Sequence, residues 1–230
     1  MRRLYHPAMG YMTRLQAAAG DTDAYVAPAR PLPGKPVLLL HAWWGLNDVI
    51  RDVADRLASD GFTVLAPDLF DGAVLRTIDE ATANQEKVEG APVSEDRLHG
   101  RVAAAFDHLL ALPEVSGKKA AVVAFSFGAW YGARLADRRD EVAAVVLYYG
   151  GIGGSELPRP PYLGHFAEVD PYEDDAATRV QLAQARPGSA AHIYPGTHHW
   201  FAESDRPEYS EAASELAYRR TLEFLRANLA

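Results

Sequence analysis

The sequence predicts an α/β protein with a mostly parallel central sheet and helices on both faces. Apolar runs of strand length alternate with segments of helical spacing through the middle and end of the chain, the pattern of parallel strands joined by crossover helices. Residues 37–40 read Val-Leu-Leu-Leu, and such an uninterrupted apolar run is typical of a strand buried on both faces. A chain of 230 residues is within the size of one α/β domain, so we expect a single domain over residues 1–230.

The N-terminal part of the chain is expected to supply the edge of this sheet and its first crossover. Residues 1–35 should form an N-terminal extension with edge strands, and the prolines between residues 28 and 36 mark a connector into the first buried strand. The first helix is expected to begin near Asn47 or Asp48, because either side chain can cap it, and to end at Gly61.

The later elements follow the same alternation of strand and helix. Further strands are expected at residues 62–66, 120–124, 142–149, 162–166 and 190–194. Further helices are expected at residues 94–112, from the end of the 120–124 strand to about residue 138, and from about residue 208 to 228.

Composition excludes several classes of protein. The formal net charge of −8 argues against a nucleic-acid partner and fits poorly with docking on an anionic membrane. The absence of cysteine removes disulfides, thiolate catalysis and cysteine-bound metals. No apolar core of signal-peptide length follows the basic start, and no run approaches the roughly 18 apolar residues of a membrane span. We therefore expect a soluble, cytoplasmic protein that acts on a small molecule as a monomer or homodimer.

A candidate nucleophile lies between a predicted strand and a predicted helix. Ala-Phe-Ser-Phe-Gly, with the serine at Ser126, directly follows the apolar run at 120–123 and directly precedes a helical pattern. A serine in such a strand–turn–helix exposes its hydroxyl above the sheet edge, with the following backbone amides aimed at the group it attacks. The alternative is a serine that only caps the helix.

A serine is a poor nucleophile without a base and an acid that orients the base. Two histidines, His198 and His199, lie in a later loop, and their spacing does not decide between them. Asp170 lies closest to the end of the 162–166 strand without being inside it. The competing acids are Glu168, Asp174 and Asp175. Because parallel strands end at one rim of a sheet, Ser126, Asp170 and His199 should meet there. Adjacent histidines splay apart, so we expect no metal site and no cofactor.

An acyl-transfer site also needs donors for an oxyanion and a pocket for the substrate. One donor should be the backbone N–H of Phe127, and the other should come from the loop after the first buried strand, with Trp43 as the candidate. All four tryptophans lie in the segments named here, and tryptophan often lines ligand pockets. An aromatic-walled pocket for an apolar or aromatic acyl group is therefore expected. Its residues are Trp44, Trp130, Trp200 and Phe201.

Other segments are given supporting roles. Residues 70–93 are polar and lack strong periodicity, and we expect them to form a partial cover over the site. The glycine-rich residues 150–154 are interpreted as a mobile surface loop, and the acidic residues 168–175 as a solvated loop with a helix start. His165 is expected to pack or hydrogen-bond at its strand end, and His41 to support the oxyanion loop.

Several stretches together resemble the dienelactone hydrolase family of the α/β-hydrolases. They are residues 41–47, 51–58 and 61–69, the turn at Ser126, and residues 164–171 and 194–201. The resemblance extends from about Val37 to the C-terminus and implies the α/β-hydrolase fold. It also implies a triad of Ser126, Asp170 and His199, because the histidine of the family's motif lies two positions before an aromatic residue, here Phe201.

Three departures from the archetype of this family bear on the substrate. Ser126 stands where the archetype has cysteine, Ala42 where it has a glutamate that activates the thiol, and Glu203 where it has an arginine that binds the substrate carboxylate. We therefore expect a hydrolase that cleaves a less acidic carboxylic ester or lactone through an acyl-serine intermediate. The alternatives are a thioesterase or peptidase with the same triad, and a ligand-binding homologue with an occluded or unused triad.

Overall fold

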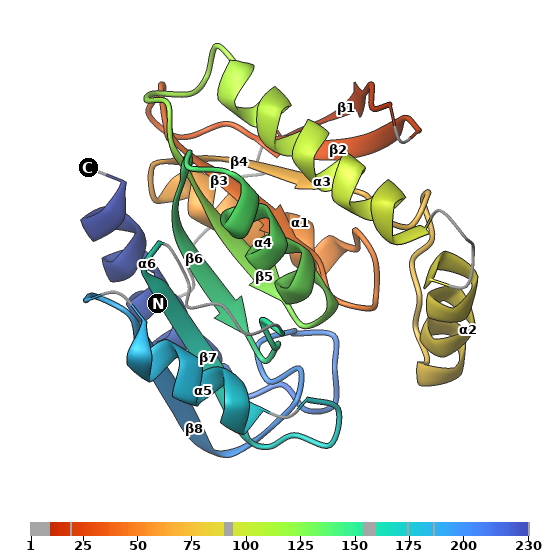
Figure 1. Ribbon diagram of the computed structural model, residues 1–230, viewed down its shortest axis with the longest axis vertical. Helices are drawn as coiled ribbons and strands as arrows, with labels where there is room; N and C mark the ends of the chain where they lie inside the picture. The colour runs from red at the N-terminus through yellow and green to blue at the C-terminus, as the bar shows by residue number, and fades with distance from the viewer. Residues whose placement is uncertain are drawn as a thin grey trace, which may run out of the picture.

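The computed structural model confirms the predicted α/β architecture. It describes residues 10–18, 20–89, 94–153, 160–173, 175–185 and 187–229. Within these ranges eight strands form one sheet in the order β1-β2-β4-β3-β5-β6-β7-β8, with helices on both faces (Figure 1). The pairs β1–β2 and β2–β4 are antiparallel, and all the others are parallel.

The elements have the following bounds. The strands are β1 (Tyr11–Leu15), β2 (Thr22–Ala27), β3 (Lys35–Leu40), β4 (Phe62–Pro67), β5 (Ala120–Phe125), β6 (Val142–Tyr148), β7 (Tyr162–Val169) and β8 (Ala190–His198). The helices are α1 (Asp48–Ser59), α2 (Ile78–Glu89), α3 (Ser94–Ala111), α4 (Phe127–Arg138), α5 (Asp175–Gln184) and α6 (Glu211–Asn228).

The sheet is buried on both faces, as the apolar run at 37–40 predicts. Val37 and Leu39 pack into a core with α1 and α6, whereas Leu38 and Leu40 pack into the opposite core with α3 and α4. Successive side chains of a strand point to opposite faces, so an uninterrupted apolar run is what such a strand requires.

Two strands extend further than predicted, and this affects the site. The strands β7 and β8 continue to Val169 and His198, and these two residues pair with each other at the end of the ladder. The interpretation of residues 168–175 as a loop with a helix start is therefore wrong for Glu168 and Val169. Polar and exposed side chains concealed these strand ends in the sequence.

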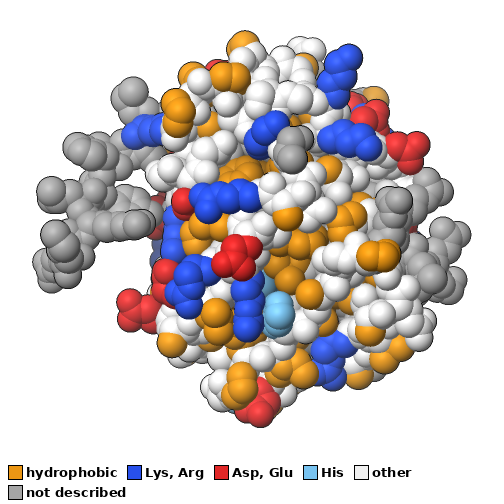
Figure 2. All heavy atoms as spheres, turned by 90° about the vertical axis from the view of Figure 1, so that its left-hand side faces the viewer, with side chains coloured by type: hydrophobic (Ala, Val, Ile, Leu, Met, Phe, Trp, Pro, Cys, Tyr) orange, Lys and Arg blue, Asp and Glu red, His pale blue; other side chains and the backbone are white. Residues whose placement is uncertain are grey.

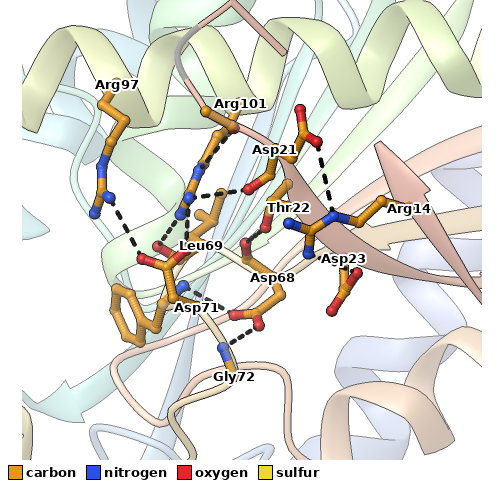
Figure 3. A network of polar contacts seen from close by, with 12 residues as sticks. Arg14, Asp21, Thr22, Asp23, Asp68, Leu69, Asp71, Gly72, Arg97 and Arg101 are labelled. Carbon is orange, nitrogen blue, oxygen red and sulfur yellow. Dashed lines mark hydrogen bonds and ion pairs between the residues drawn. The ribbon is translucent and has the colours of Figure 1, made fainter. Parts of the chain in front are cut away.

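The segment after β4 is anchored to the antiparallel edge of the sheet (Figure 3). Arg101 of α3 has only 3% of its side chain exposed. Its guanidinium contacts four acceptors: the carbonyls of Gly20, Asp21 and Leu69, and the carboxylate of Asp71. These contacts fix the chain where it leaves the sheet toward α2, which stands apart from the sheet in Figure 1.

The C-terminal helix is joined to the sheet by its apolar side and to neighbouring elements by ion pairs. Arg56 of α1 pairs with Glu215 of α6 at 2.7 Å, and Arg226 of α6 pairs with Asp60 at 3.3 Å. Charged side chains of both signs lie among hydrophobic ones on the face shown in Figure 2. Within the described ranges, no helix combines the length and apolarity needed to cross a bilayer.

One glycine lets α4 approach β3 closely enough to support the turn at Ser126. A Cβ at Gly128 would lie 2.8 Å from the carbonyl oxygen of His41 and 2.8 Å from the Cβ of Leu40. Because backbone atoms cannot move away easily, we expect Gly128→Ala to lower the free energy of unfolding by about 1–3 kcal/mol in urea denaturation.

Gly132→Ala is the matched control in the same helix. A Cβ at Gly132 would first meet a side-chain atom of Val122, at 3.0 Å. Both substitutions replace glycine by alanine within a helix, so the gain in intrinsic helix propensity is the same. We expect a smaller loss of stability than for Gly128→Ala, and equal stability of the two variants would contradict the steric argument.

Candidate active site

Ser126 occupies a strained turn between β5 and α4. Its backbone has φ 45° and ψ −114°, in a region that non-glycine residues rarely adopt. Its side chain makes no capping hydrogen bond to the helix, which argues against a purely capping serine. The glycine at position 150 leaves room for this turn, because a Cβ there would lie 2.7 Å from the carbonyl oxygen of Ser126. The turn thus has the form of a nucleophile elbow.

A hydrogen-bonded chain links Ser126 to an imidazole and a carboxylate. The Oγ of Ser126 lies 2.9 Å from Nε2 of His199, and Nδ1 of His199 lies 2.6 Å from Oδ2 of Asp170. The side chains of His199 and Asp170 are 2% and 5% exposed. With Nδ1–H donating to Asp170, Nε2 is free to accept the hydroxyl proton of Ser126.

The carboxylate of Asp170 is itself held by the backbone. Its Oδ1 accepts the N–H groups of Tyr172 and Glu173 at 3.0 and 3.1 Å, which leaves Oδ2 for His199. These bonds arise because the chain turns immediately after β7. The three residues come from the ends of β5, β7 and β8, so the sheet edge brings them together as the sequence predicts.

The structure distinguishes the triad residues from neighbouring histidines and acids that sequence spacing alone could not exclude. His198 is exposed and belongs to β8, whereas His199 is buried against Ser126. Glu168 is also exposed, and its Oε2 accepts the N–H of Gly196 at 2.7 Å. Asp174 lies outside the described residues, as does the side chain of Asp175.

The hydroxyl of Ser126 faces a cavity of about 650 Å³. This volume is in the range of small-molecule binding sites. Its walls are mainly aromatic, with polar groups from three loops and from α2. The lining residues are Trp43, Gln85, Ser126, Phe127, Trp130, Tyr131, Gly151, Gly153, Tyr172, Glu173, His199 and Trp200. Of the predicted pocket residues, Trp130 and Trp200 line the cavity, together with the predicted oxyanion donors Trp43 and Phe127.

Two predicted pocket residues lie elsewhere. Trp44 is 2% exposed and packs in the core with its ring edge against Trp200, at a centroid distance of 4.9 Å. Phe201 is fully buried and packs against Tyr149 at 5.3 Å. Each follows a tryptophan that does line the cavity, and neighbouring side chains diverge, so one of each pair faces the cavity and the other the core.

The described part of the glycine-rich segment is a loop, as predicted, and it is also part of the cavity wall. Gly151 and Gly153 line the cavity, and Ile152 is only 4% exposed. A Cβ at Gly153 would lie 1.9 Å from the ring of Trp130. Glycine therefore serves here to bring backbone close to an aromatic ring. Residue 154 lies outside the described residues.

Buried histidines near the sheet edge make structural hydrogen bonds. In His165, Nδ1 lies 2.9 Å from the hydroxyl of Tyr194 and Nε2 lies 3.0 Å from that of Thr221, and burial lowers its pKa well below the ordinary value. Nε2 of His41 accepts the N–H of Leu69, and its Nδ1 donates to the carbonyl of Ala42 at 2.7 Å. His165 and His41 thus have the supporting contacts expected of them. Among the described residues, no three His, Asp or Glu side chains converge as metal ligands.

Glu203, at the position of the archetypal arginine, points into the core beneath the site. It is fully buried, and one carboxyl oxygen accepts the hydroxyl of Tyr149 at 3.0 Å. The ring of Tyr149 in turn lies 5.0 Å from that of His199. Burial raises the pKa of Glu203 to about 8, so the neutral carboxylic acid is the form that this environment favours.

This raised pKa should make stability depend on pH. The carboxyl group stabilises the folded state most below its ordinary pKa of 4.5, and that contribution is lost as the pH rises toward about 8. Glu203→Gln mimics the neutral acid and still accepts the hydroxyl of Tyr149. We expect the stability of the variant relative to the wild type to rise by about 3–5 kcal/mol between pH 5 and pH 9 in urea denaturation. An identical difference at both pH values would contradict the raised pKa.

Known proteins are similar to this chain along nearly its whole length. The profile of the dienelactone hydrolase family matches residues 22–229. A protein of Azospirillum brasilense, provisionally named carboxymethylenebutenolidase, is 28% identical over 232 residues, which cover 95% of this chain and 100% of the relative.

Solved structures share the fold. A dienelactone hydrolase from Anabaena variabilis aligns with a TM-score of 0.71 and 20% identity, over 98% of this chain and 100% of that chain. A dienelactone hydrolase-like promiscuous phosphotriesterase from metagenomic libraries aligns with a TM-score of 0.78 and 21% identity, over 96% and 99%. The family match and the sheet described above agree, and the chain therefore belongs to the dienelactone hydrolase family of α/β-hydrolases.

Proposed function

We propose that this hydrolase cleaves a carboxylic ester or lactone through an acyl-serine intermediate. The observation that carries the proposal is the hydrogen-bonded chain from Ser126 through His199 to Asp170, which opens into an aromatic cavity. Each component has the geometry that its role requires, with a nucleophile 2.9 Å from its base and the base 2.6 Å from a carboxylate.

The reaction follows from these contacts. His199 accepts the proton of Ser126 as Oγ attacks the carbonyl carbon, and Asp170 stabilises the imidazolium that forms. The tetrahedral intermediate collapses as the leaving alcohol takes that proton, which leaves the acyl group on Ser126. Water, deprotonated by His199, then attacks the acyl group. The bond to Oγ breaks as Ser126 takes the proton back from His199, which releases the acid and restores the triad. The substitution of Ala42 for the archetypal glutamate is compatible with this route, because a serine activated by its own histidine needs no carboxylate in the first loop.

The oxyanion is proposed to bind the backbone N–H groups of Phe127 and Trp43. Phe127 is the first residue of α4, and the first N–H groups of a helix have no partner within the helix. Trp43 lies in the loop after β3 and lines the cavity itself. Gln85 of α2 also contributes to the lining, which supports residues 70–93 as a partial cover.

An unused triad is the less favoured alternative. Occlusion by the two tryptophans of the first loop is not supported, because Trp44 lies in the core and Ser126 borders an open cavity. Thioester or peptide cleavage would use the same attack, and the cavity determines which leaving group fits.

The nucleophile can be tested by chemical labelling and by substitution. The wild type should react with a fluorophosphonate probe at Ser126 and hydrolyse a simple aryl ester. Ser126→Ala should lose both reactions while its circular dichroism and unfolding midpoint stay close to the wild type, because one small side chain at the surface of a cavity is removed. Labelling of another serine, or turnover by Ser126→Ala, would contradict the proposal.

The role of Asp170 can be tested against that of Glu168, a neighbouring carboxylate near the end of β7. Asp170→Asn should lower kcat for the same ester by up to about 10⁴-fold, because the amide cannot hold the histidine in its reactive tautomer. Glu168→Gln is the control, since it removes a nearby charge and still accepts the N–H of Gly196. Comparable losses in both variants would indicate a general electrostatic effect instead of a specific role for Asp170.

A further inference from the structure

The charged groups around the cavity differ from those expected for an anionic substrate. Among the described lining residues there is no lysine or arginine, and Glu173 is an acidic residue of the lining. Asp170, three residues earlier in the same loop, adds a second carboxylate, on the side of His199 that faces away from Ser126. Glu203, at the position of the archetypal arginine, is buried in the core. A substrate anion would therefore meet repulsion from these carboxylates, and no cationic side chain among the described lining residues would offset it.

An aromatic wall adjoins this carboxylate. Tyr172 contacts Trp200 at a centroid distance of 4.7 Å and Trp43 at 6.3 Å, so the three rings form one continuous surface. Glu173 directly follows Tyr172 in the chain, and Trp130 also lines the cavity. Aromatic faces attract cations, most strongly when the cation is partly removed from water.

We infer that the cavity recognises an ester or lactone carrying a cationic nitrogen, which lies between the carboxylate of Glu173 and the wall formed by Trp43, Tyr172 and Trp200. This inference rests on the proposed ester or lactone hydrolysis and adds the substrate class. Glu173 then determines specificity and takes no part in the bond-making steps. The net charge of −8 would also favour the approach of a cationic substrate.

Glu173 has a second contact that an experiment must keep constant. Its carboxylate accepts the N–H of Gly151, and a Cβ at Gly151 would lie 3.2 Å from its Oε2. The glutamate could therefore serve only to hold the glycine-rich wall. Glu173→Gln separates the two roles, because the amide oxygen can still accept this hydrogen bond while the charge is lost. Burial and the charge of Asp170 raise the pKa of Glu173 to about 6, so the carboxylate is ionised at pH 8.

The test compares substrates that differ only in charge, at pH 8. On the acyl side, the 4-nitrophenyl esters of 4-(trimethylammonio)butanoate and of its carbon isostere 5,5-dimethylhexanoate are used. On the alcohol side, acetylcholine is compared with 3,3-dimethylbutyl acetate. Each kcat/KM is divided by the rate constant of hydroxide-catalysed hydrolysis, so that intrinsic reactivity cancels. The mono-4-nitrophenyl ester of glutarate serves as the anionic substrate.

For at least one pair, the wild type should prefer the cationic substrate by about tenfold or more, and the anionic ester should be the poorest. Glu173→Gln should reduce this preference to near one and improve the relative rate of the anionic ester. Glu168→Gln, which removes a carboxylate outside the cavity lining, should leave the wild-type ratio unchanged.

Two outcomes would overturn the inference and leave the proposed function standing. One is cleavage of the neutral esters with no preference for the cation in either pair. The other is a preference that Glu173→Gln does not alter, which would assign Glu173 to holding Gly151. If instead no ester is cleaved and the fluorophosphonate does not label Ser126, the proposed function itself fails, and the substrate class fails with it.

Discussion

The backbone turn at Ser126 is the constraint on which the rest of the site depends. Among the described residues, four other than glycine have positive φ. Three of these belong to the site: Ser126 itself, Tyr149, whose ring contacts His199, and Trp200, which follows His199. Such conformations cost on the order of 1–3 kcal/mol each and persist only where packing determines them. Here Gly128 and Gly150 allow α4, β3 and the loop after β6 to close around the turn. The fold therefore maintains a strained backbone after β5 and β8, where Ser126 and His199 are positioned, and after the intervening strand β6.

Burial then determines which ionisable groups near the site carry charge. Burial lowers the pKa of His165 and raises that of Glu203, so both environments favour the neutral form. The carboxylate of Asp170 accepts hydrogen bonds from two backbone N–H groups and from the imidazole of His199. An imidazolium formed during attack would thus be stabilised by the well-oriented carboxylate of Asp170. The carboxyl group of Glu203 would contribute little, because Tyr149 lies between it and His199.

The sequence allowed the sheet and the triad to be predicted for the same physical reason. Buried parallel strands are apolar runs, and their carboxyl ends share a rim, so a site with Ser126, Asp170 and a histidine follows from local patterns. The choice of His199 over His198 came from the family resemblance. The pocket was harder to predict, because Trp43 and Trp44 are consecutive residues of the same type, yet Trp43 lines the cavity and Trp44 packs in the core. Only the direction of the loop determines which ring faces the cavity. Glu173 and Gln85 were missed because nothing in a polar loop or a polar helix indicates which side chain reaches a cavity built mostly by other elements.

Two of the three departures from the archetype, at Ala42 and Glu203, have one electrostatic consequence. Ala42 stands where the archetype has a carboxylate in the first loop. Glu203 stands where it has a cation, and burial favours the uncharged form of this acid. The negative charge bordering the cavity then comes from the loop after β7, where Glu173 is one of the two residues whose backbone N–H groups hold Asp170. Because that loop must exist to present the acid to His199, a change of one residue within it alters the charge of the cavity without altering the triad. Substrate charge can therefore vary in such a protein while the attack by Ser126 stays the same.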